Sequence, residues 1–144
     1  MNNLSVLPIP GLLRRRGVMA VLIGTMPASE VLTATLSAAN VPTIVIPDTS
    51  DKYAVGSTLD DINDNKTTIW DKGRRQLLIV GDVRSAKLIK LCLTTRASNF
   101  EVFVCSNFSD NNPYVSIAAQ RLLNAGVHPI GFDYVLDELS QSEN

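Results

Sequence analysis

Two aspartates stand where a carboxylate could do chemistry. Asp48 directly follows the apolar run Pro42–Pro47, and Asp82 directly follows Leu77–Gly81. In open α/β sheets, ligands bind beyond the carboxyl ends of the strands. Two carboxylates there could hold Mg²⁺ or serve as acid and base. The simpler interpretation, which we prefer, is that both acids cap neighbouring helices or turns.

Three other side chains could act as nucleophile, base or metal ligand. Cys92 and Cys105 lie in the apolar runs LIKLCLTT and EVFVCSN, which favours buried thiols that pack as small hydrophobes. Two cysteines do not indicate a disulfide scaffold. His128 is the only histidine, so a zinc site with a His pair is excluded and a Ser-His-Asp triad would need this residue. We expect His128 to be structural.

Composition excludes further classes of function. Gly24 stands alone after its apolar run, so neither a dinucleotide fingerprint nor a P-loop is present. A formal net charge of −1 gives no broad basic field, so nucleic acid is not an expected partner. We expect no cofactor and no metal.

The N-terminal part of the chain has two interpretations. Arg14, Arg15 and Arg16 precede the apolar stretch GVMAVLIGTMPA, an order that resembles a signal peptide. The apolar stretch is too short to span a membrane, and it also fits a buried first strand. We prefer the strand and expect a protein of the reducing cytoplasm that does not contact membranes.

Apolar strand-like runs alternate with helical patterns along the chain. This order predicts an α/β fold in which helices cover both faces of a central parallel sheet, a three-layer α/β/α sandwich. Strands are predicted at Val18–Ile23, Pro42–Pro47, Leu77–Gly81, Glu101–Cys105 and Val127–Ile130. Helices are predicted at Ser29–Ala39, Ser85–Ala97, Tyr114–Asn124 and from Asp133 through Leu139.

Polar residues, proline and glycine mark the predicted helix ends. Helix N-caps favour Ser, Asp and Asn, proline suits the first turn, and glycine or asparagine favours the C-terminus. The expected capping and turn residues are Ser29, Asn112 or Asn111, Pro113, Asp133, Asn40 and Gly126.

The length of 144 residues predicts one domain, 1–144, large enough to bury a core. Within it we expect an N-terminal extension at 1–16, an irregular loop at 48–72 and a frayed tail at 140–144. A short helix near Ser57–Ile62 is possible inside the loop, and Trp70 lies where the loop rejoins the core. Irregular segments this long are usually functional or mobile.

Residues 73–138 resemble the C-terminal half of the isochorismatase-like cysteine hydrolases. GRRQLLIVG at Gly73–Gly81 resembles the strand that enters their catalytic turn, and EVFVCSN resembles the next strand at the expected distance. AAQRLLNAGVHPIGFDYVLDEL resembles the ending of one branch of that superfamily. The resemblance covers a little under half of the chain.

The resemblance implies a central parallel sheet, assembly into dimers or larger oligomers, and a Cys-Asp-Lys triad. In that family the aspartate ends the first strand, a lysine lies in the middle of the chain, and the cysteine begins the helix after the third strand. A thiolate there is activated by the helix N-terminus and a neighbouring cation.

This chain departs from the family pattern at the catalytic positions. The aspartate position falls on Gly24 or its neighbours, and the cysteine position, six residues after Gly81, is Lys87. The acid that ends the fourth strand in the family is Asn107 here. Cys92 lies about 140° round the helix from the nucleophile position.

Other parts of the pattern are incomplete. Lys52 and Lys66 are both candidates for the middle lysine. The chain is also shorter than usual for the family, with material missing after the first strand and before Gly73. The sequence therefore predicts a divergent, shortened relative without the standard triad.

Three functions follow from these observations. The preferred one is a catalytically degenerate protein that acts by binding or self-assembly as a homo-oligomer. Its candidate pocket could hold a small carboxylate, because Arg and Lys favour such anions. The pocket residues are Arg84, Lys87, Asn107, Asp82 and Asp48.

Two alternatives remain open. One is an active hydrolase of a small amide or vinyl-ether substrate with relocated catalytic groups, such as Asp48 or Asp82 with a lysine. The other is an unrelated α/β domain that binds Mg²⁺ or a small anion at these two acids. Arg84 and Lys87 could also simply be solvated in the first turn of a helix.

Overall fold

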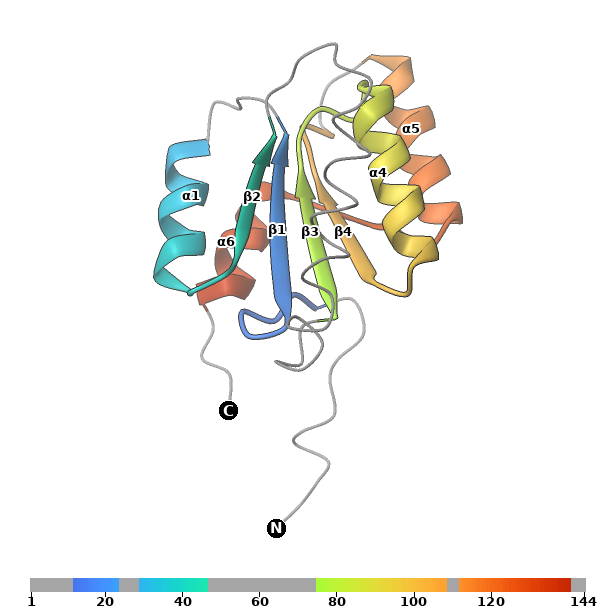
Figure 1. The fold of residues 1–144 in the computed structure, drawn as a ribbon. Helices are drawn as coiled ribbons and strands as arrows, with labels where there is room; N and C mark the ends of the chain where they lie inside the picture. Colours follow the sequence, from blue (N-terminus) through green and yellow to red (C-terminus); the bar gives the residue numbers. More distant parts are fainter. Residues whose placement is uncertain (1–11, 24–28, 47–74, 109–111, 141–144) are drawn as a thin grey trace.

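The computed structural model describes residues 12–23, 29–46, 75–108 and 112–140 (Figure 1). Predictions that concern Asp48, Lys52, Lys66, the helix at Ser57–Ile62 and Trp70 lie outside these residues. Among the helices that are described, none is long and apolar enough to cross a membrane.

The five described strands form one parallel sheet in the order β2-β1-β3-β4-β5. β1, β3 and β4 are central and consist of apolar residues almost throughout, as expected for strands covered on both faces. The strand order reverses between β1 and β3, and ligands bind at such switch points in open α/β sheets. The strands are β1 at Val18–Ile23, β2 at Thr43–Ile46, β3 at Gln76–Val80, β4 at Glu101–Cys105 and β5 at His128–Ile130.

Helices cover the sheet on both sides (Figure 1). α1 (Ser29–Ala38) and α6 (Phe132–Ser140) pack on one face, whereas α4 (Ala86–Ala97) and α5 (Pro113–Asn124) pack on the other. Alternate side chains of β1, β3 and β4 point into two separate apolar cores, one under each pair of helices. The predicted three-layer α/β/α sandwich is confirmed.

Several predicted helix ends are confirmed. Ser85 caps α4, and the Asn112 side chain accepts a 2.9 Å hydrogen bond from the Tyr114 backbone N–H ahead of α5. Gly126, after α5, has φ +86°, and Asn40, after α1, has φ 58°. Both residues occupy the left-handed conformation that glycine and asparagine tolerate best.

Two predicted caps are wrong by one or two residues. α1 already includes Ser29 as its first residue, so Ser29 does not precede the helix. α6 begins at Phe132, and the Gly131 carbonyl, rather than Asp133, closes its first turn by accepting from the Val135 N–H at 3.1 Å. Phe132 packs against the core, so burial of this ring starts the helix before the acid.

The end of the predicted N-terminal extension is tied to the sheet. The fully buried Gln76 side chain accepts from the Arg14 N–H at 2.8 Å and donates to the Leu12 carbonyl at 2.7 Å. It also donates to Glu101 at 2.8 Å. Leu13 between them is 2% exposed. Residues 12–14 are therefore tied to the amino ends of β3 and β4. Ser140, the first residue of the predicted frayed tail, still belongs to α6, and the rest of that prediction lies outside the described residues.

Candidate functional site

The candidate site lies at the carboxyl ends of β1, β3 and β4. Gly81 brings these strand ends together, because a Cβ there would lie 2.7 Å from Leu88 Cδ1 and 3.3 Å from both Cβ and the carbonyl oxygen of Ile23. The Gly81 N–H continues the pairing with β4 by donating to the Cys105 carbonyl at 3.1 Å. A residue without a side chain is thus required for the turn that follows β3.

Asp82 and Arg84 form a closed ion pair within this turn. Arg84 Nη2 lies 2.8 Å from Asp82 Oδ2, and Arg84 Nε lies 3.1 Å from both carboxylate oxygens. The Arg84 backbone N–H also donates to Asp82 Oδ1 at 2.9 Å. These hydrogen bonds lower the pKa of Asp82, although both side chains are about half exposed. The predicted role of Asp82 in capping a turn agrees with this geometry.

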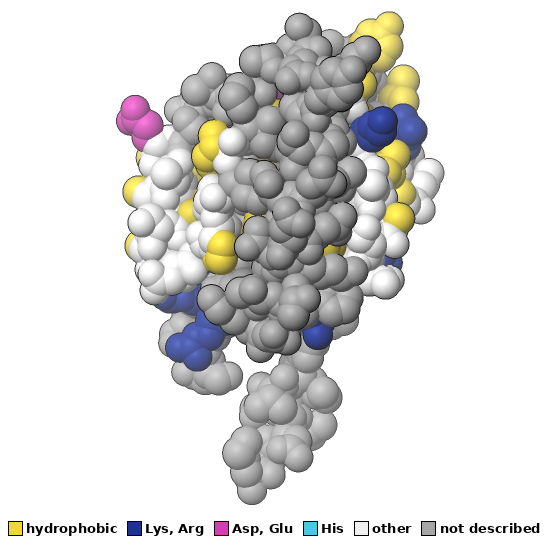
Figure 2. Space-filling view, in the orientation of Figure 1, with side chains coloured by type: hydrophobic (Ala, Val, Ile, Leu, Met, Phe, Trp, Pro, Cys, Tyr) yellow, Lys and Arg dark blue, Asp and Glu magenta, His cyan; other side chains and the backbone are white. Residues whose placement is uncertain are grey.

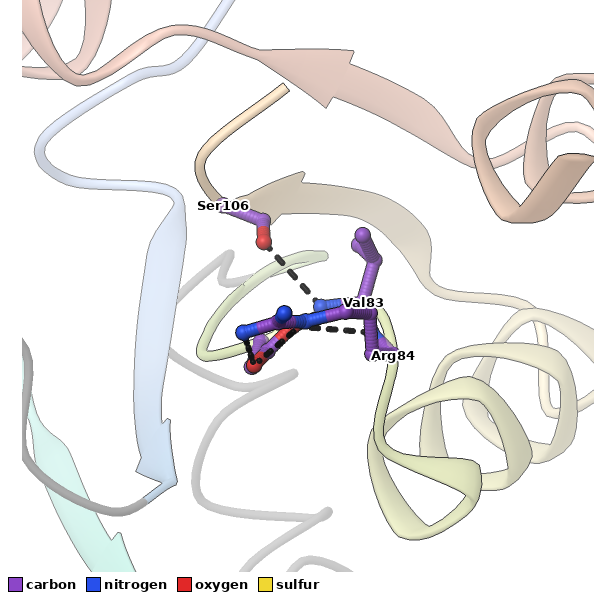
Figure 3. A network of polar contacts seen from close by, with 4 residues as sticks. Val83, Arg84 and Ser106 are labelled. Atoms are coloured by element: carbon purple, nitrogen blue, oxygen red, sulfur yellow. Dashed lines mark hydrogen bonds and ion pairs between the residues drawn. The ribbon is translucent and has the colours of Figure 1, made fainter. Parts of the chain in front are cut away.

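Ser106 is the site residue that the sequence did not reveal. Its side chain is 9% exposed and accepts a 3.1 Å hydrogen bond from the backbone N–H of Val83 (Figure 3). This hydrogen bond connects the turn after β3 to the end of β4. The sequence gives only a weak indication of this role. Ser106 directly follows an apolar strand, and adjacent parallel strands end at the same edge of a sheet.

The other predicted pocket residues approach the same edge. Lys87 is the second residue of α4 and is half-buried, and Asn107 is exposed two residues after β4 ends. The described structure thus brings Asp82 and Arg84 into direct contact, and Lys87 follows three residues later in the first turn of α4. Asp48, the fifth predicted pocket residue, lies outside the described residues.

Neither thiol is placed to act as the nucleophile. Cys92 is fully buried in the middle of α4, and burial raises its pKa to about 12. Cys105 is 1% exposed at the end of β4, and burial raises its pKa to about 11. The two thiols belong to cores on opposite faces of the sheet. Both are protonated at neutral pH, and thiols react as thiolates.

His128 points away from the edge that carries Asp82. Its Nε2 lies 3.5 Å from Glu101 Oε2 at the start of β4, and its ring centroid lies 5.0 Å from that of Phe103. Glu101 also accepts from the buried Gln76. This arrangement agrees with the structural role expected for the only histidine.

The described residues offer little for a metal ion. No group of three or more His, Cys, Asp or Glu side chains comes together within the described parts of the chain. Asp82, the one acid at the candidate edge that the structure describes, already accepts hydrogen bonds from Arg84 on both carboxylate oxygens.

Comparison with solved structures identifies proteins of the same fold. No family model matches the chain, and no curated protein matches it. A solved structure of YcaC from Pseudomonas aeruginosa with hexane-2,5-diol and covalent acrylamide is 18% identical, with a TM-score of 0.65. That match covers 92% of this chain and 84% of YcaC.

A second match is the YcaC gene product of Escherichia coli, described as an octameric hydrolase of unknown specificity. It is 17% identical, has a TM-score of 0.58, and covers 94% of this chain and 85% of that protein. At this level of identity the likeness concerns the fold alone. The chain therefore has the isochorismatase-like α/β/α fold that its sequence predicts, which is also the fold of the two YcaC structures.

Proposed function

We propose that this protein is a divergent relative of the isochorismatase-like cysteine hydrolases that has lost their chemistry and acts through binding or self-assembly. The observation that carries the proposal is Lys87. It stands in the first turn of α4, six residues after Gly81, where the resemblance requires a cysteine. A lysine there cannot form the covalent thioester-type intermediate on which cysteine hydrolysis depends.

The states of the two thiols support the same conclusion. A catalytic cysteine needs a lowered pKa and access to substrate. Cys92 and Cys105 have raised pKa values and almost no exposed surface. Two buried, unpaired thiols also suit a reducing compartment, so we propose a cytoplasmic location.

Within this proposal, self-assembly has better support than capture of a small carboxylate. A ligand carboxylate at Arg84 would have to displace Asp82, which already makes the paired hydrogen bonds that a guanidinium offers. A homo-oligomer is in keeping with the octamer described for the Escherichia coli protein of the same fold.

Alkylation of the folded protein tests the loss of cysteine chemistry. We expect intact-mass spectrometry to find no rapid adduct with acrylamide or iodoacetamide at neutral pH, because both thiols are buried and protonated. The same protein in denaturant should gain two adducts, one at each cysteine. Rapid modification of a single thiol in the folded state would contradict the proposal.

An assay for turnover distinguishes the proposed loss of activity from the alternative of an active hydrolase. In a hydrolase with relocated groups, Asp48 or Asp82 with a lysine would supply the acid and base, and of the two acids the structure describes Asp82. Arg84 lowers the pKa of Asp82, which makes its carboxylate a weak base at neutral pH. Steady hydrolysis of a small amide or vinyl ether that disappears in Asp82→Asn would favour this alternative.

A further inference from the structure

The two helical layers carry opposite charges. All charged side chains of α4 and α5 are cationic, and all charged side chains of α1 and α6 are acidic. Figure 2 shows basic side chains over the α4 and α5 side and an acidic side chain over α1 on the opposite side. The cations are Lys87, Lys90, Arg96 and Arg121, and the acids are Glu30, Asp133, Asp137 and Glu138.

The cationic layer also has an apolar groove. Tyr114 and Ile117 lie one turn apart on α5 and are 70% and 64% exposed. Together with Ile89 and Leu93 of α4 they line two adjoining hollows of about 290 and 560 Å³. Arg121 borders both hollows.

The acidic layer presents a matching feature. Tyr134 on the outer face of α6 is 67% exposed. Asp133 precedes it and Asp137 follows one turn later, and both are exposed. An aromatic ring flanked by two carboxylates complements an apolar groove bordered by Lys90 and Arg121.

We propose that the α6 face of one copy, with Tyr134 at its centre, docks in the α4–α5 groove of a second copy. The inference rests on the self-assembly part of the proposed function and specifies its contact. The apolar side chains supply most of the affinity, and the charges select the partner face and its orientation.

Charge decides between this front-to-back contact and a symmetric one. If two α4–α5 faces met, Lys90 and Arg121 would face their own copies, and two α6 faces would likewise oppose Asp133 and Asp137. Like charges in apposition are unfavourable, whereas the front-to-back contact pairs opposite charges. Such a heterologous contact closes into a ring when its rotation permits, and otherwise extends as a filament.

Reciprocal charge reversal tests the contact. One variant carries Lys90→Glu with Arg121→Glu, and the other carries Asp133→Lys with Asp137→Lys. Each alone would set like charges against each other in a front-to-back contact. Light scattering coupled to gel filtration at about 0.05 M salt, where screening is weak, measures the assembly. A control, Arg16→Glu with Arg75→Glu, changes the net charge by the same amount and sign as the first variant, but away from the helical faces.

We expect the wild type and the control to assemble and each reversed variant alone to elute as the 15.6 kDa monomer. An equimolar mixture of the two variants should recover the assembly. Persistent assembly of either variant alone, loss of assembly in the control, or a mixture that stays monomeric would each overturn the contact.

The assembly state of the wild type and the folding of the variants decide the remaining outcomes. A wild-type monomer would overturn both this contact and self-assembly, and would leave the groove to an acidic amphipathic helix of another protein. An assembled wild type with unaffected variants would overturn the contact alone. If circular dichroism shows that a reversed variant is unfolded, Lys90→Gln with Arg121→Gln, or Asp133→Asn with Asp137→Asn, must reduce assembly instead.

Discussion

At the scale of single residues, Asp82 has two separable roles in the turn after β3. Its Oδ1 accepts from the Arg84 backbone N–H, and its carboxylate pairs with the Arg84 guanidinium. Exposed ion pairs contribute little to stability, whereas hydrogen bonds that close a turn or cap contribute more. The backbone contact should therefore matter more than the charge.

Substitution at Asp82 tests this ranking. We expect Asp82→Asn to change the free energy of unfolding by less than about 0.5 kcal/mol, because the amide oxygen can still accept from the Arg84 N–H. Asp82→Ala should cost about 1 kcal/mol, because the turn then loses its side-chain acceptor. Urea unfolding at neutral pH measures both values, and equal losses in the two variants would contradict the account.

Asp82 also makes the stability of the protein depend on pH. Arg84 lowers the pKa of Asp82 in the folded state, so the small stabilisation is present above the pKa of the unfolded chain. It should be lost as the pH falls from about 4 through the lower folded-state value. In Arg84→Gln, NMR titration should show the pKa of Asp82 shifted upward, and an unchanged pKa would argue against the ion pair.

Sequence alone predicted part of this geometry. An aspartate just after an apolar strand indicates a turn, and the Asp82 side chain fulfils that prediction locally. The contact from Val83 to Ser106 spans 23 positions and depends on which strands are neighbours and in which register. Local patterns do not contain that information.

At the scale of elements, the close approach of β1, β3 and α4 at Gly81 determines where the site lies. Gly81→Ala should destabilise the fold by about 1–3 kcal/mol, because its Cβ would lie 2.7 Å from the fully buried Leu88 side chain. Thermal and urea unfolding measure this loss.

Gly131→Ala is the matched control for Gly81→Ala. There the nearest atom to the added Cβ is Tyr134 Cδ2 at 3.4 Å, an ordinary contact. This variant should lose clearly less stability than Gly81→Ala. A reversed order would show that the turn after β3 can relax.

Helix boundaries were predictable where a residue's own conformation sets them. Gly126 and Asn40 adopt positive φ, and Pro113 with Asn112 opens α5, all as the sequence predicts. The start of α6 was not predictable in this way. The helix begins at Phe132, one residue before the predicted cap Asp133, and the Phe132 ring packs against the core. Tertiary packing here overrides a local capping preference.

At the scale of the whole molecule, the chain segment before β1 is tied to the sheet by the buried Gln76 side chain and to α6 by Glu138, which accepts from the Leu13 N–H at 2.7 Å. Gln76 joins residues 12–14 to Glu101 through three hydrogen bonds. Gln76→Leu should destabilise the protein by about 2–4 kcal/mol, because it removes three part-buried hydrogen bonds at once. Urea unfolding measures the loss.

Gln120→Leu serves as the control for Gln76→Leu. Gln120 is exposed on α5, and its side chain bonds only to Asn124 among the hydrogen bonds described for it. Its replacement should change stability by less than about 0.5 kcal/mol. Similar losses in both variants would show that Gln76 does not hold the segment.

The charge asymmetry of the molecule could not be recognised from composition. The cations of one helical layer and the acids of the other cancel in the net charge of −1. Only the assignment of the helices to the two faces of the sheet reveals their separation. The fold was easier to predict, because buried parallel strands leave a continuous apolar signal in the sequence. The resemblance to the isochorismatase-like hydrolases rests on the spacing from Gly81 onward, and the same spacing puts Lys87 at the cysteine position of that pattern.

The most direct test of the central claim is to place a cysteine at position 87. Lys87→Cys and its matched control, Lys90→Cys, place a thiol on α4 at its first turn and one turn later. The pH dependence of acrylamide addition, followed by peptide mass spectrometry, measures the pKa of each new thiol.

If Lys87 occupies the former nucleophile position, the thiol at 87 should have the lower pKa by at least about half a unit, because the helix N-terminus stabilises its thiolate. Reaction at neutral pH should then be faster at 87 despite its smaller exposure. A thiol pKa at position 87 that is equal to or higher than the one at position 90 would contradict the claim that Lys87 occupies a former nucleophile position.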